Sequence, residues 1–185
     1  IPARNEEDNI GRAVESLLNQ TYPTDRYTVI VVDDHSEDRT AEIVATRQAE
    51  HPNLQLLEGR PLTDGWTGKS NACATGVTRA DGDWYCFMDA DTYAEPELLR
   101  AAVRYALHHK ADLLSFNPFQ ELVSFTERAL LPGVFLAIAS SMDFRKANDP
   151  DAPEAIANGQ FLLFRRSAYE AIGGHDSVKD VVMED

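Results

Sequence analysis

Residues 84–99 read WYCFMDADTYAEPELL. A short, mostly apolar run leads directly into Asp89, Ala90 and Asp91, and a helix-forming segment follows. An apolar run of this kind predicts a buried strand that ends in carboxylates. Side chains alternate along an extended chain, so Asp89 and Asp91 are expected on the same face. Two carboxylates held this close repel each other unless a cation lies near them.

Strands and helices alternate on both sides of this stretch. Strands are predicted at 27–34, 53–59, 84–91 and 111–116, and helices at 6–20, 36–50, 68–80 and 95–109. This alternation predicts an α/β domain whose mostly parallel sheet is flanked by helices on both faces. Ligands of such sheets bind beyond the carboxyl ends of the strands.

After residue 116 the alternation stops. The apolar stretch at 122–142 has helical character, and two interpretations stay open for it. Apolar helical stripes are usually core, so the favoured one is packing against the sheet. The other is a helix that rests on a membrane surface where a lipid acceptor arrives. Residues 158–174 then predict a strand, a turn and a helix.

The charge and composition of the chain limit the classes of function that it can have. Lys plus Arg is 17 and Asp plus Glu is 31, which gives a net charge of −14 and argues against a nucleic-acid-binding protein. Cys73 and Cys86 lie in apolar settings and are predicted to be buried thiols in a reducing compartment. The sequence shows no signal peptide and no apolar run of membrane-spanning length, so a cytoplasmic location is expected. The first residues resemble the end of a strand, so we expect a fragment of a longer protein.

The ends of two predicted strands carry acidic pairs. Carboxylates, waters and phosphate oxygens are the ligands that Mg²⁺ or Mn²⁺ prefers, so Asp89 and Asp91 predict a metal clamp for a diphosphate. The alternative is a solvated loop in which Asp89 caps a helix. Asp33 and Asp34 end an earlier strand, and one of them could accept a hydrogen bond from a base such as uracil. Capping of the next helix is the alternative there.

Lys69 lies at the N-terminus of a predicted helix, where it could offset phosphate charge beside free backbone N–H groups. The alternative interpretation is that Lys69 is an ordinary surface lysine. The surrounding GKS is no P-loop, because Thr63 stands where that motif needs a glycine. A carboxylate at a substrate cleft can act as a general base toward an alcohol, and Glu184 and Asp185 are candidates, although charged loops are usually just solvated. His175 either lies near the cleft or caps a loop.

In their order along the chain, these motifs resemble the family 2 glycosyltransferases of GT-A fold. The resemblance rests on IPARNEEDNI, SLLNQTYP, IVVDDHSEDRT, GKSNACATG, GDWYCFMDADT, NGQFLLFRRSAYEAIGGHD and the final ED. A narrower resemblance, carried by WTGKSNAC and the apolar stretch after FNPFQ, points to the bacterial branch that acts on isoprenoid-type lipids such as hopanoids and carotenoids. Many members carry a further Gln-x-x-Arg-Trp motif and membrane helices, and this sequence contains neither, so membrane attachment stays open.

The resemblance implies one catalytic domain over residues 1–185, with a nucleotide-binding half at 1–116 and an acceptor-side half at 117–185. It also assigns roles to individual residues. Those implied for the nucleotide pocket are Pro2, Ala3, Arg4, Glu6, Asp33, Asp34, Lys69 and Asp89. The metal ligands would be Asp91 and Asp89, and the catalytic base Asp185. The wall near the donor sugar and acceptor would comprise Asn158, Gly159, Gln160 and Glu184.

The expected function is therefore an inverting, metal-dependent transfer of a sugar from a nucleoside-diphosphate sugar, with UDP favoured by family frequency, to an acceptor hydroxyl. The expected cofactor is Mn²⁺ or Mg²⁺, and an isoprenoid-type lipid is one acceptor option. A peripheral membrane contact through 122–142 would then place the full-length protein at the cytoplasmic face of a membrane. Two alternatives stay open: a nucleotidyltransferase, which usually shows a glycine-rich loop that PARNEED lacks, and a non-catalytic domain that binds sugar nucleotides.

Overall fold

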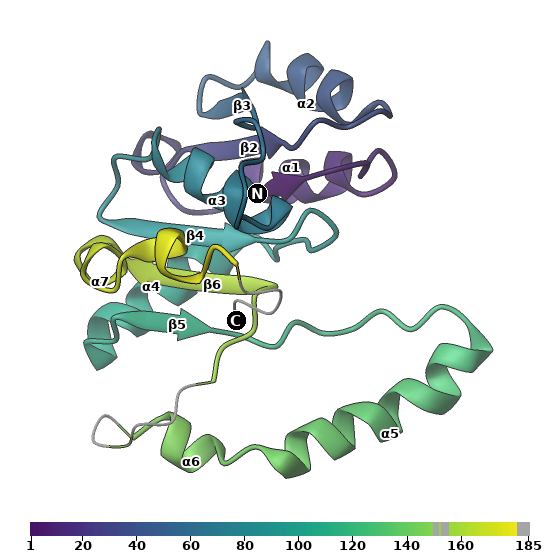
Figure 1. Ribbon diagram of the computed structural model, residues 1–185, viewed down its shortest axis with the longest axis vertical. Helices are drawn as coiled ribbons and strands as arrows, with labels where there is room; N and C mark the ends of the chain where they lie inside the picture. Colours follow the sequence, from purple (N-terminus) through teal and green to yellow (C-terminus); the bar gives the residue numbers. More distant parts are fainter. Residues whose placement is uncertain (150–151, 153–155, 181–185) are drawn as a thin grey trace.

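The computed structural model describes residues 1–149, 152 and 156–180 (Figure 1). Its strands are β1 (Pro2–Ala3), β2 (Val29–Asp33), β3 (Leu54–Glu58), β4 (Trp84–Met88), β5 (Leu113–Ser115) and β6 (Phe161–Arg165). Its α-helices are α1 (Ile10–Leu18), α2 (Thr40–Gln48), α3 (Gly68–Val77), α4 (Leu98–His109), α5 (Phe125–Ser141), α6 (Phe144–Ala147) and α7 (Arg166–Ala171). Two short 3₁₀ helices are η1 (Thr24–Arg26) and η2 (Gly174–Val178).

The strands form two three-stranded sheets, in the orders β1-β2-β3 and β4-β6-β5. The first sheet is parallel throughout. In the second, β6 runs antiparallel to both β4 and β5, while β2, β4 and β5 all point the same way (Figure 1). The predicted α/β architecture with a mostly parallel sheet is thus confirmed. The antiparallel β6 sets Phe161 opposite Met88, which brings the start of β6 beside the end of β4.

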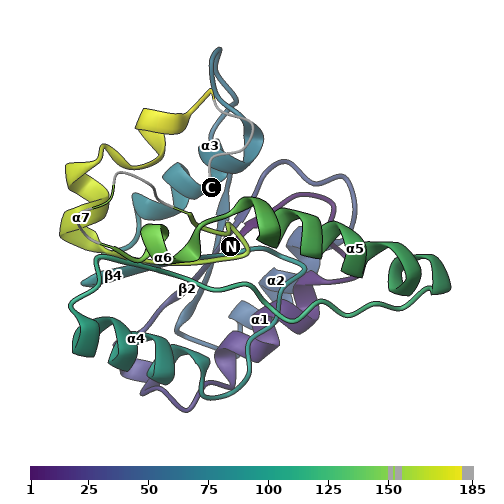
Figure 2. The same cartoon turned by 90° about the horizontal axis from the view of Figure 1, so that it is seen from below.

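Helices cover both faces of the strands, with α1, α2 and α4 on one face and α3 and α7 on the other (Figure 2). On the first face, Ile10 and Val14 of α1 and Val44 of α2 are completely buried against β2 and β3. On the second face, Cys73 of α3 and Tyr169 of α7 pack on the aromatic side chains of β4 and its neighbours. Both faces of the strands are therefore apolar, which explains the nearly continuous apolar run of β2.

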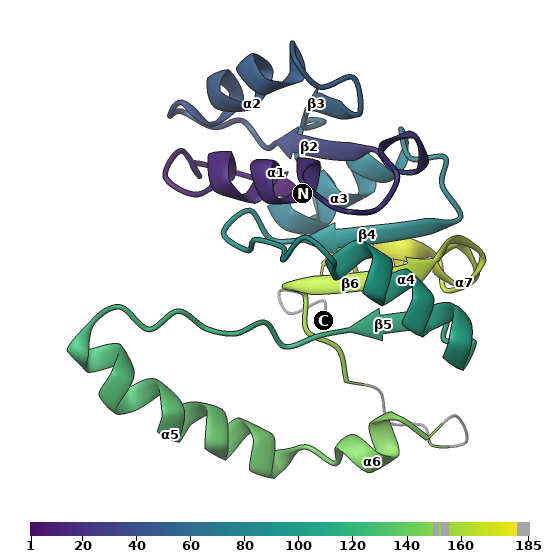
Figure 3. The same ribbon diagram turned by 180° about the vertical axis from the view of Figure 1, so that it is seen from behind.

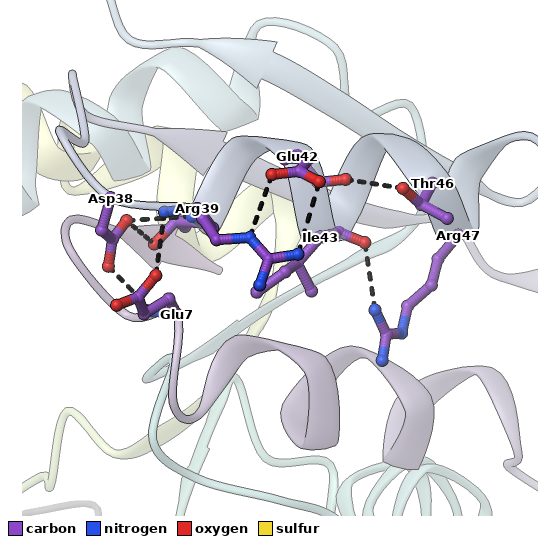
Figure 4. Close-up of polar contacts among 8 residues, drawn as sticks. Glu7, Asp38, Arg39, Glu42, Ile43, Thr46 and Arg47 are labelled. Carbon is purple, nitrogen blue, oxygen red and sulfur yellow. Dashed lines mark hydrogen bonds and ion pairs between the residues drawn. The ribbon is translucent and has the colours of Figure 1, made fainter.

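The loop after β1 is tied to the start of α2 by a group of polar contacts (Figure 4). The backbone N–H of Glu7 donates to Asp38, and the carboxylate of Glu7 accepts from the N–H of Arg39. Asp38 also accepts from the N–H of Thr40, the first residue of α2. Glu7 therefore precedes α1, although the sequence predicts a helix from residue 6. These contacts brace the loop between β1 and α1 against the start of α2.

A cavity of about 530 Å³ lies between β2 and β4. The backbone nitrogen of Ile1 lies in its wall and donates to the carbonyl of Ile30, 2.8 Å away. Cys73 is buried as predicted, but Cys86 is exposed, so its predicted burial is wrong. Cys86 lines this cavity, on the edge of β4 that lies opposite to β6 and has no partner among the described strands. Desolvation by the surrounding protein raises the pKa of the Cys86 thiol to about 12.

Helix α5 and the short α6 stand away from both sheets (Figure 3). A capping box formed by Ser124 and Glu127 starts α5, which contains no buried residue. Leu130 and Leu136 are 62% and 69% exposed. The favoured interpretation of this stretch as core packed against the sheet is therefore wrong. Although α5 is apolar, no helix in the described part of the chain has both the length and the hydropathy needed to cross a bilayer.

Candidate active site

The end of β4, the first turn of α3 and the loop before β6 meet around a cavity of about 260 Å³. Four predicted site residues contribute to its wall: Pro2, Lys69, Asp89 and Gly159. The rest of the wall is largely apolar and includes Phe87 and Leu162. An apolar hollow with a few converging charged groups is the usual form of a small-molecule site. The larger cavity between β2 and β4 is a weaker candidate, because Pro2 is its sole contribution from the described site residues.

Lys69 and Asp89 form an ion pair at this cavity. The Lys69 Nζ lies 3.2 Å from an Asp89 carboxylate oxygen, and the two side chains are 40% and 28% exposed. Asp91 is exposed in the turn after β4, where the N–H of Thr92 donates to the carbonyl of Asp89. Within the described residues, no group of three or more His, Cys, Asp or Glu side chains could hold a metal ion. A divalent ion here would therefore take two protein carboxylates and complete its shell from waters and substrate, as Mg²⁺ commonly does.

Asp34 forms the centre of a second group, at the ends of β1 and β2. Its side chain is nearly buried and pairs with Arg4, whose Nη1 lies 3.6 Å from Oδ2. The carboxylate also lies against two glycines. A Cβ atom added to Gly68 would lie 2.8 Å from Asp34 Oδ2, and one added to Gly59 would lie 3.2 Å from Oδ1. Gly68 is the first residue of α3, so Asp34 sits at the N-terminus of that helix, where a negative charge is stabilised.

Asp33, the last residue of β2, has a buried carboxylate oxygen. Its Oδ1 has no hydrogen-bond partner among the described residues, whereas Oδ2 accepts weakly from the N–H of Ser36 at 3.4 Å. A buried acceptor without a partner carries a desolvation cost. A ligand with an N–H or O–H group at this strand end would remove that cost.

Ala3 and Glu6 shape the strand end without presenting charge to it. The carbonyl of Ala3 accepts from the N–H of Asp34, which fixes the ends of β1 and β2 side by side. The Glu6 carboxylate accepts from the side chain of Asn9, and its N–H donates to Thr40. These contacts tie Glu6 to the starts of α1 and α2.

Asn158, Gly159 and Gln160 lie immediately before β6 and so beside the end of β4. The N–H of Asn158 donates to the Ser115 hydroxyl at 2.7 Å, and the Asn158 side-chain oxygen accepts from the N–H of Gln160 at 2.9 Å. The side chain of Gln160 in turn accepts from Gln120 at 3.1 Å. These hydrogen bonds stabilise the loop as one wall of the cavity.

Tyr169 and His175 form a buried pair in the same cavity wall. The Tyr169 hydroxyl lies 2.6 Å from His175 Nδ1 and accepts from the backbone N–H of His175 at 3.1 Å. Burial raises the pKa of Tyr169 to about 12, so its hydroxyl stays protonated. Of the two interpretations of His175, the position near the cleft agrees with the structure. Tyr169 was not among the predicted site residues, since a tyrosine on an apolar helix stripe looks like ordinary core.

The structure therefore brings the described candidates into two groups that share the first turn of α3. Lys69 reaches the Asp89 group, and Gly68 lies against the Asp34 group. Sequence reasoning missed Gly59 and Gly68, whose signal is the position of each glycine next to a loop or helix start. Glu184 and Asp185, which the sequence predicts as site residues, lie outside the described residues.

An α/β fold with its site at the carboxyl ends of the strands is the architecture of GT-A glycosyltransferases. Comparison with solved structures agrees. The mannosyltransferase PcManGT from Pyrobaculum calidifontis, in complex with GDP-Man and Mn²⁺, matches with a TM-score of 0.69 at 25% identity over 94% of this chain and 45% of the other. Residues 1–349 of TarS from S. aureus match with a TM-score of 0.52 at 27% identity over 66% and 37%.

The sequence comparisons identify the family. Residues 1–173 match the model of glycosyl transferase family 2. The whole chain aligns with 48% of the 4,4'-diaponeurosporenoate glycosyltransferase of Staphylococcus aureus strain USA300, at 33% identity over 192 residues. The chain belongs to glycosyl transferase family 2, a family of transferase enzymes. It spans about half the length of the curated relatives it matches.

Proposed function

We propose that this chain carries the donor site of an inverting glycosyltransferase that moves a sugar from a nucleoside-diphosphate sugar to an acceptor hydroxyl. The observation that carries the proposal is the 260 Å³ cavity at the ends of the strands, where Lys69, Asp89 and Gly159 meet. A cation, a carboxylate and a loop backbone in one hollow offer partners for a diphosphate, a metal ion and a sugar. Family membership supports the same class of reaction.

The nucleotide would bind to the half of the domain formed by residues 1–116. In this proposal Asp34 or Asp33 accepts a hydrogen bond from the base, with Asp33 Oδ1 as a buried acceptor in need of a donor. Pro2, Ala3 and Arg4 shape the pocket beside it, and Glu6 supports the pocket through the loop it anchors. UDP is the favoured nucleotide. A UDP complex of TarS is among the similar structures, and PcManGT was solved with GDP-Man, so a comparison of UDP- and GDP-sugars tests this assignment.

The residues at the end of β4 fit a hard divalent cation. Asp89 already attracts a positive charge, because the ammonium group of Lys69 stands 3.2 Å from it. Asp89 and Asp91 would hold Mn²⁺ or Mg²⁺, which supplies positive charge against the departing diphosphate. Lys69, at the start of α3, would add a second positive charge on the phosphate side. The Mn²⁺ in the PcManGT complex is consistent with this assignment.

The acceptor would approach from residues 117–185. The donor sugar would face the wall formed by Asn158, Gly159 and Gln160. Glu184, which precedes the proposed catalytic base Asp185 in the sequence, would belong to the same wall. Asp185 would take the proton of the acceptor hydroxyl while its oxygen attacks the anomeric carbon from the face opposite the leaving diphosphate. The relative from S. aureus is named for a carotenoid-type acid, so we propose a carotenoid-like or other isoprenoid-type lipid as the acceptor. The exposed apolar surface of α5 would contact that lipid or the membrane that holds it, at the cytoplasmic face.

The catalytic test is Asp185→Asn in the full-length protein. Removing a general base is expected to lower turnover by ~10²–10⁴-fold while the affinity for UDP changes little. Sugar transfer is measured with Mn²⁺ and a series of nucleotide sugars, and nucleotide affinity by calorimetry. Asp81→Asn, an exposed aspartate at the opposite end of β4, is the matched control. Wild-type turnover by Asp185→Asn would exclude this base.

A further inference from the structure

The ion pair between Lys69 and Asp89 joins two groups with different expected ligands. Lys69 is the second residue of α3, where the helix dipole already provides positive charge and disfavours a lysine. An anion nearby offsets this cost, and the Asp89 carboxylate at 3.2 Å is such an anion. Asp89 in turn lies at a strand end whose acidic character favours a cation. In the nucleotide-free chain each charged group thus has the other as a partner.

We propose that Lys69 is a positioning residue that exchanges partners: it holds Asp89 until a nucleoside diphosphate arrives, and then turns to the phosphates. The inference rests on the proposed function and adds a coupling between the two ligands. A diphosphate competes with Asp89 for the ammonium group. Once Lys69 has left, the Asp89 carboxylate oxygen that it held can bind a divalent cation. Both side chains are part-exposed, at 40% and 28%, so the exchange needs no opening of the core.

The exchange has a thermodynamic consequence. If the diphosphate removes Lys69 from Asp89, the diphosphate increases the affinity for the metal, and the metal increases the affinity for the diphosphate by the same factor. Lys69 also works against metal binding in the absence of nucleotide, both by occupying the carboxylate and by its own charge. A neutral side chain at position 69 should therefore affect the two ligands in opposite directions. A purely structural role for Lys69 would not produce this pattern.

The test measures Mn²⁺ binding without nucleotide, and UDP binding at a fixed saturating Mn²⁺ concentration, by calorimetry. For Lys69→Gln we expect Mn²⁺ alone to bind about tenfold tighter and UDP about tenfold weaker than in the wild type. Lys69→Arg keeps the charge and should restore both affinities toward the wild-type values. Arg104→Gln removes one positive charge from an exposed position of α4 and should leave both within about twofold.

A double variant isolates the pair. In an Asp89→Asn background, Lys69→Gln should give only the small gain in Mn²⁺ affinity that comes from removing its charge, because the carboxylate that Lys69 occupies is absent. The inference is overturned if Lys69→Gln binds Mn²⁺ no tighter than the wild type, or if the full gain persists without Asp89. If either result comes with normal sugar transfer, it removes the exchange and leaves the proposed function intact. Failure of every nucleotide sugar to bind the wild type would instead overturn the proposed function and the inference with it.

Discussion

Asp34 owes its position to two glycines. Its carboxylate lies so close to Gly59 and Gly68 that a methyl group on either would meet it at 3.2 Å or less. The close approach lets one carboxylate reach both the N-terminus of α3 and the guanidinium of Arg4. The absence of a side chain at these two glycines therefore allows the Asp34 carboxylate to take this position.

Gly68→Ala should therefore weaken nucleotide binding. The added Cβ would lie 2.8 Å from Asp34 Oδ2 and push the carboxylate out of its place. We expect UDP affinity to fall about tenfold, or ~1.4 kcal/mol, as measured by calorimetry with Mn²⁺ present. Gly133→Ala in α5 is the control, because a Cβ there has no neighbour within 4 Å. Unchanged UDP affinity in Gly68→Ala would remove Asp34 from the nucleotide site.

Tyr169→Phe should destabilise the chain. The hydroxyl accepts from the buried N–H of His175 and forms a hydrogen bond with Nδ1 of its ring, and the variant removes both contacts. Loss of a buried hydrogen-bond partner costs about 1–3 kcal/mol, which urea unfolding would detect. Tyr105→Phe, where the side chain is 51% exposed, should change stability by less than ~0.5 kcal/mol. Equal stability of the two variants would contradict the structural role of the pair.

The same tyrosine predicts a loss of stability at high pH. Burial raises the pKa of Tyr169 from 10.0 to about 12 in the folded chain. Above pH 10 the unfolded chain loses this proton first, so the free energy of unfolding falls as the pH rises toward 12. Below pH 10 the contribution is fully present. Tyr169→Phe should show a shallower fall across this range in urea unfolding, and a fall as steep as that of the wild type would contradict the assignment.

At the scale of elements, α5 is the segment whose surroundings differ most from the favoured expectation. Its apolar residues carry helical spacing, and the capping box at Ser124 makes it a well-defined helix. Apolar content alone predicts burial, yet the helix stands clear of both sheets (Figures 1 and 3). The position of an apolar helix depends on the segments that connect it to the rest of the fold. Here residues 116–124, which connect β5 to α5, extend away from the sheets, so α5 does not pack on them.

Helix α5 should mediate binding to lipid vesicles. Leu136 is 69% exposed, and burying a leucine side chain contributes about 1.5–3 kcal/mol. Flotation with phosphatidylcholine vesicles should recover the wild type, and Leu136→Glu should lower the partition coefficient at least ~tenfold. Leu107→Glu, at a 56% exposed site on α4, is the control and should float like the wild type. Recovery of the wild type in the soluble fraction alone would exclude the membrane contact.

At the scale of the whole molecule, the carboxyl ends of β1, β2 and β4 place the two acidic groups along one edge, with α3 between them. Nucleotide and metal would then bind across both groups and stabilise the folded state. At a ligand concentration one hundred times Kd, the gain is about 2.7 kcal/mol. For a chain of this size that raises the Tm by about 5–11 °C.

A thermal-shift screen of UDP-, GDP- and dTDP-sugars with Mn²⁺ should reveal this gain for one base above the others. Replacement of Mn²⁺ by EDTA should abolish most of the shift, because the diphosphate would then lose its proposed bridge to Asp89 and Asp91. A shift of equal size in EDTA would contradict the metal clamp, and the absence of any shift would contradict the donor site.

The α/β class, most of the strands and the strand-end location of the acidic residues could be predicted from the amino-acid sequence. These features follow from local apolar periodicity and from the common edge of parallel strands. Four features became visible only in the folded chain: the antiparallel direction of β6, the exposure of Cys86 and α5, the pairing of Lys69 with Asp89, and the contact of Asp34 with Gly68. Each of these depends on which segments, distant along the chain, come to lie side by side. The spacing of residues within one segment carries no information about that.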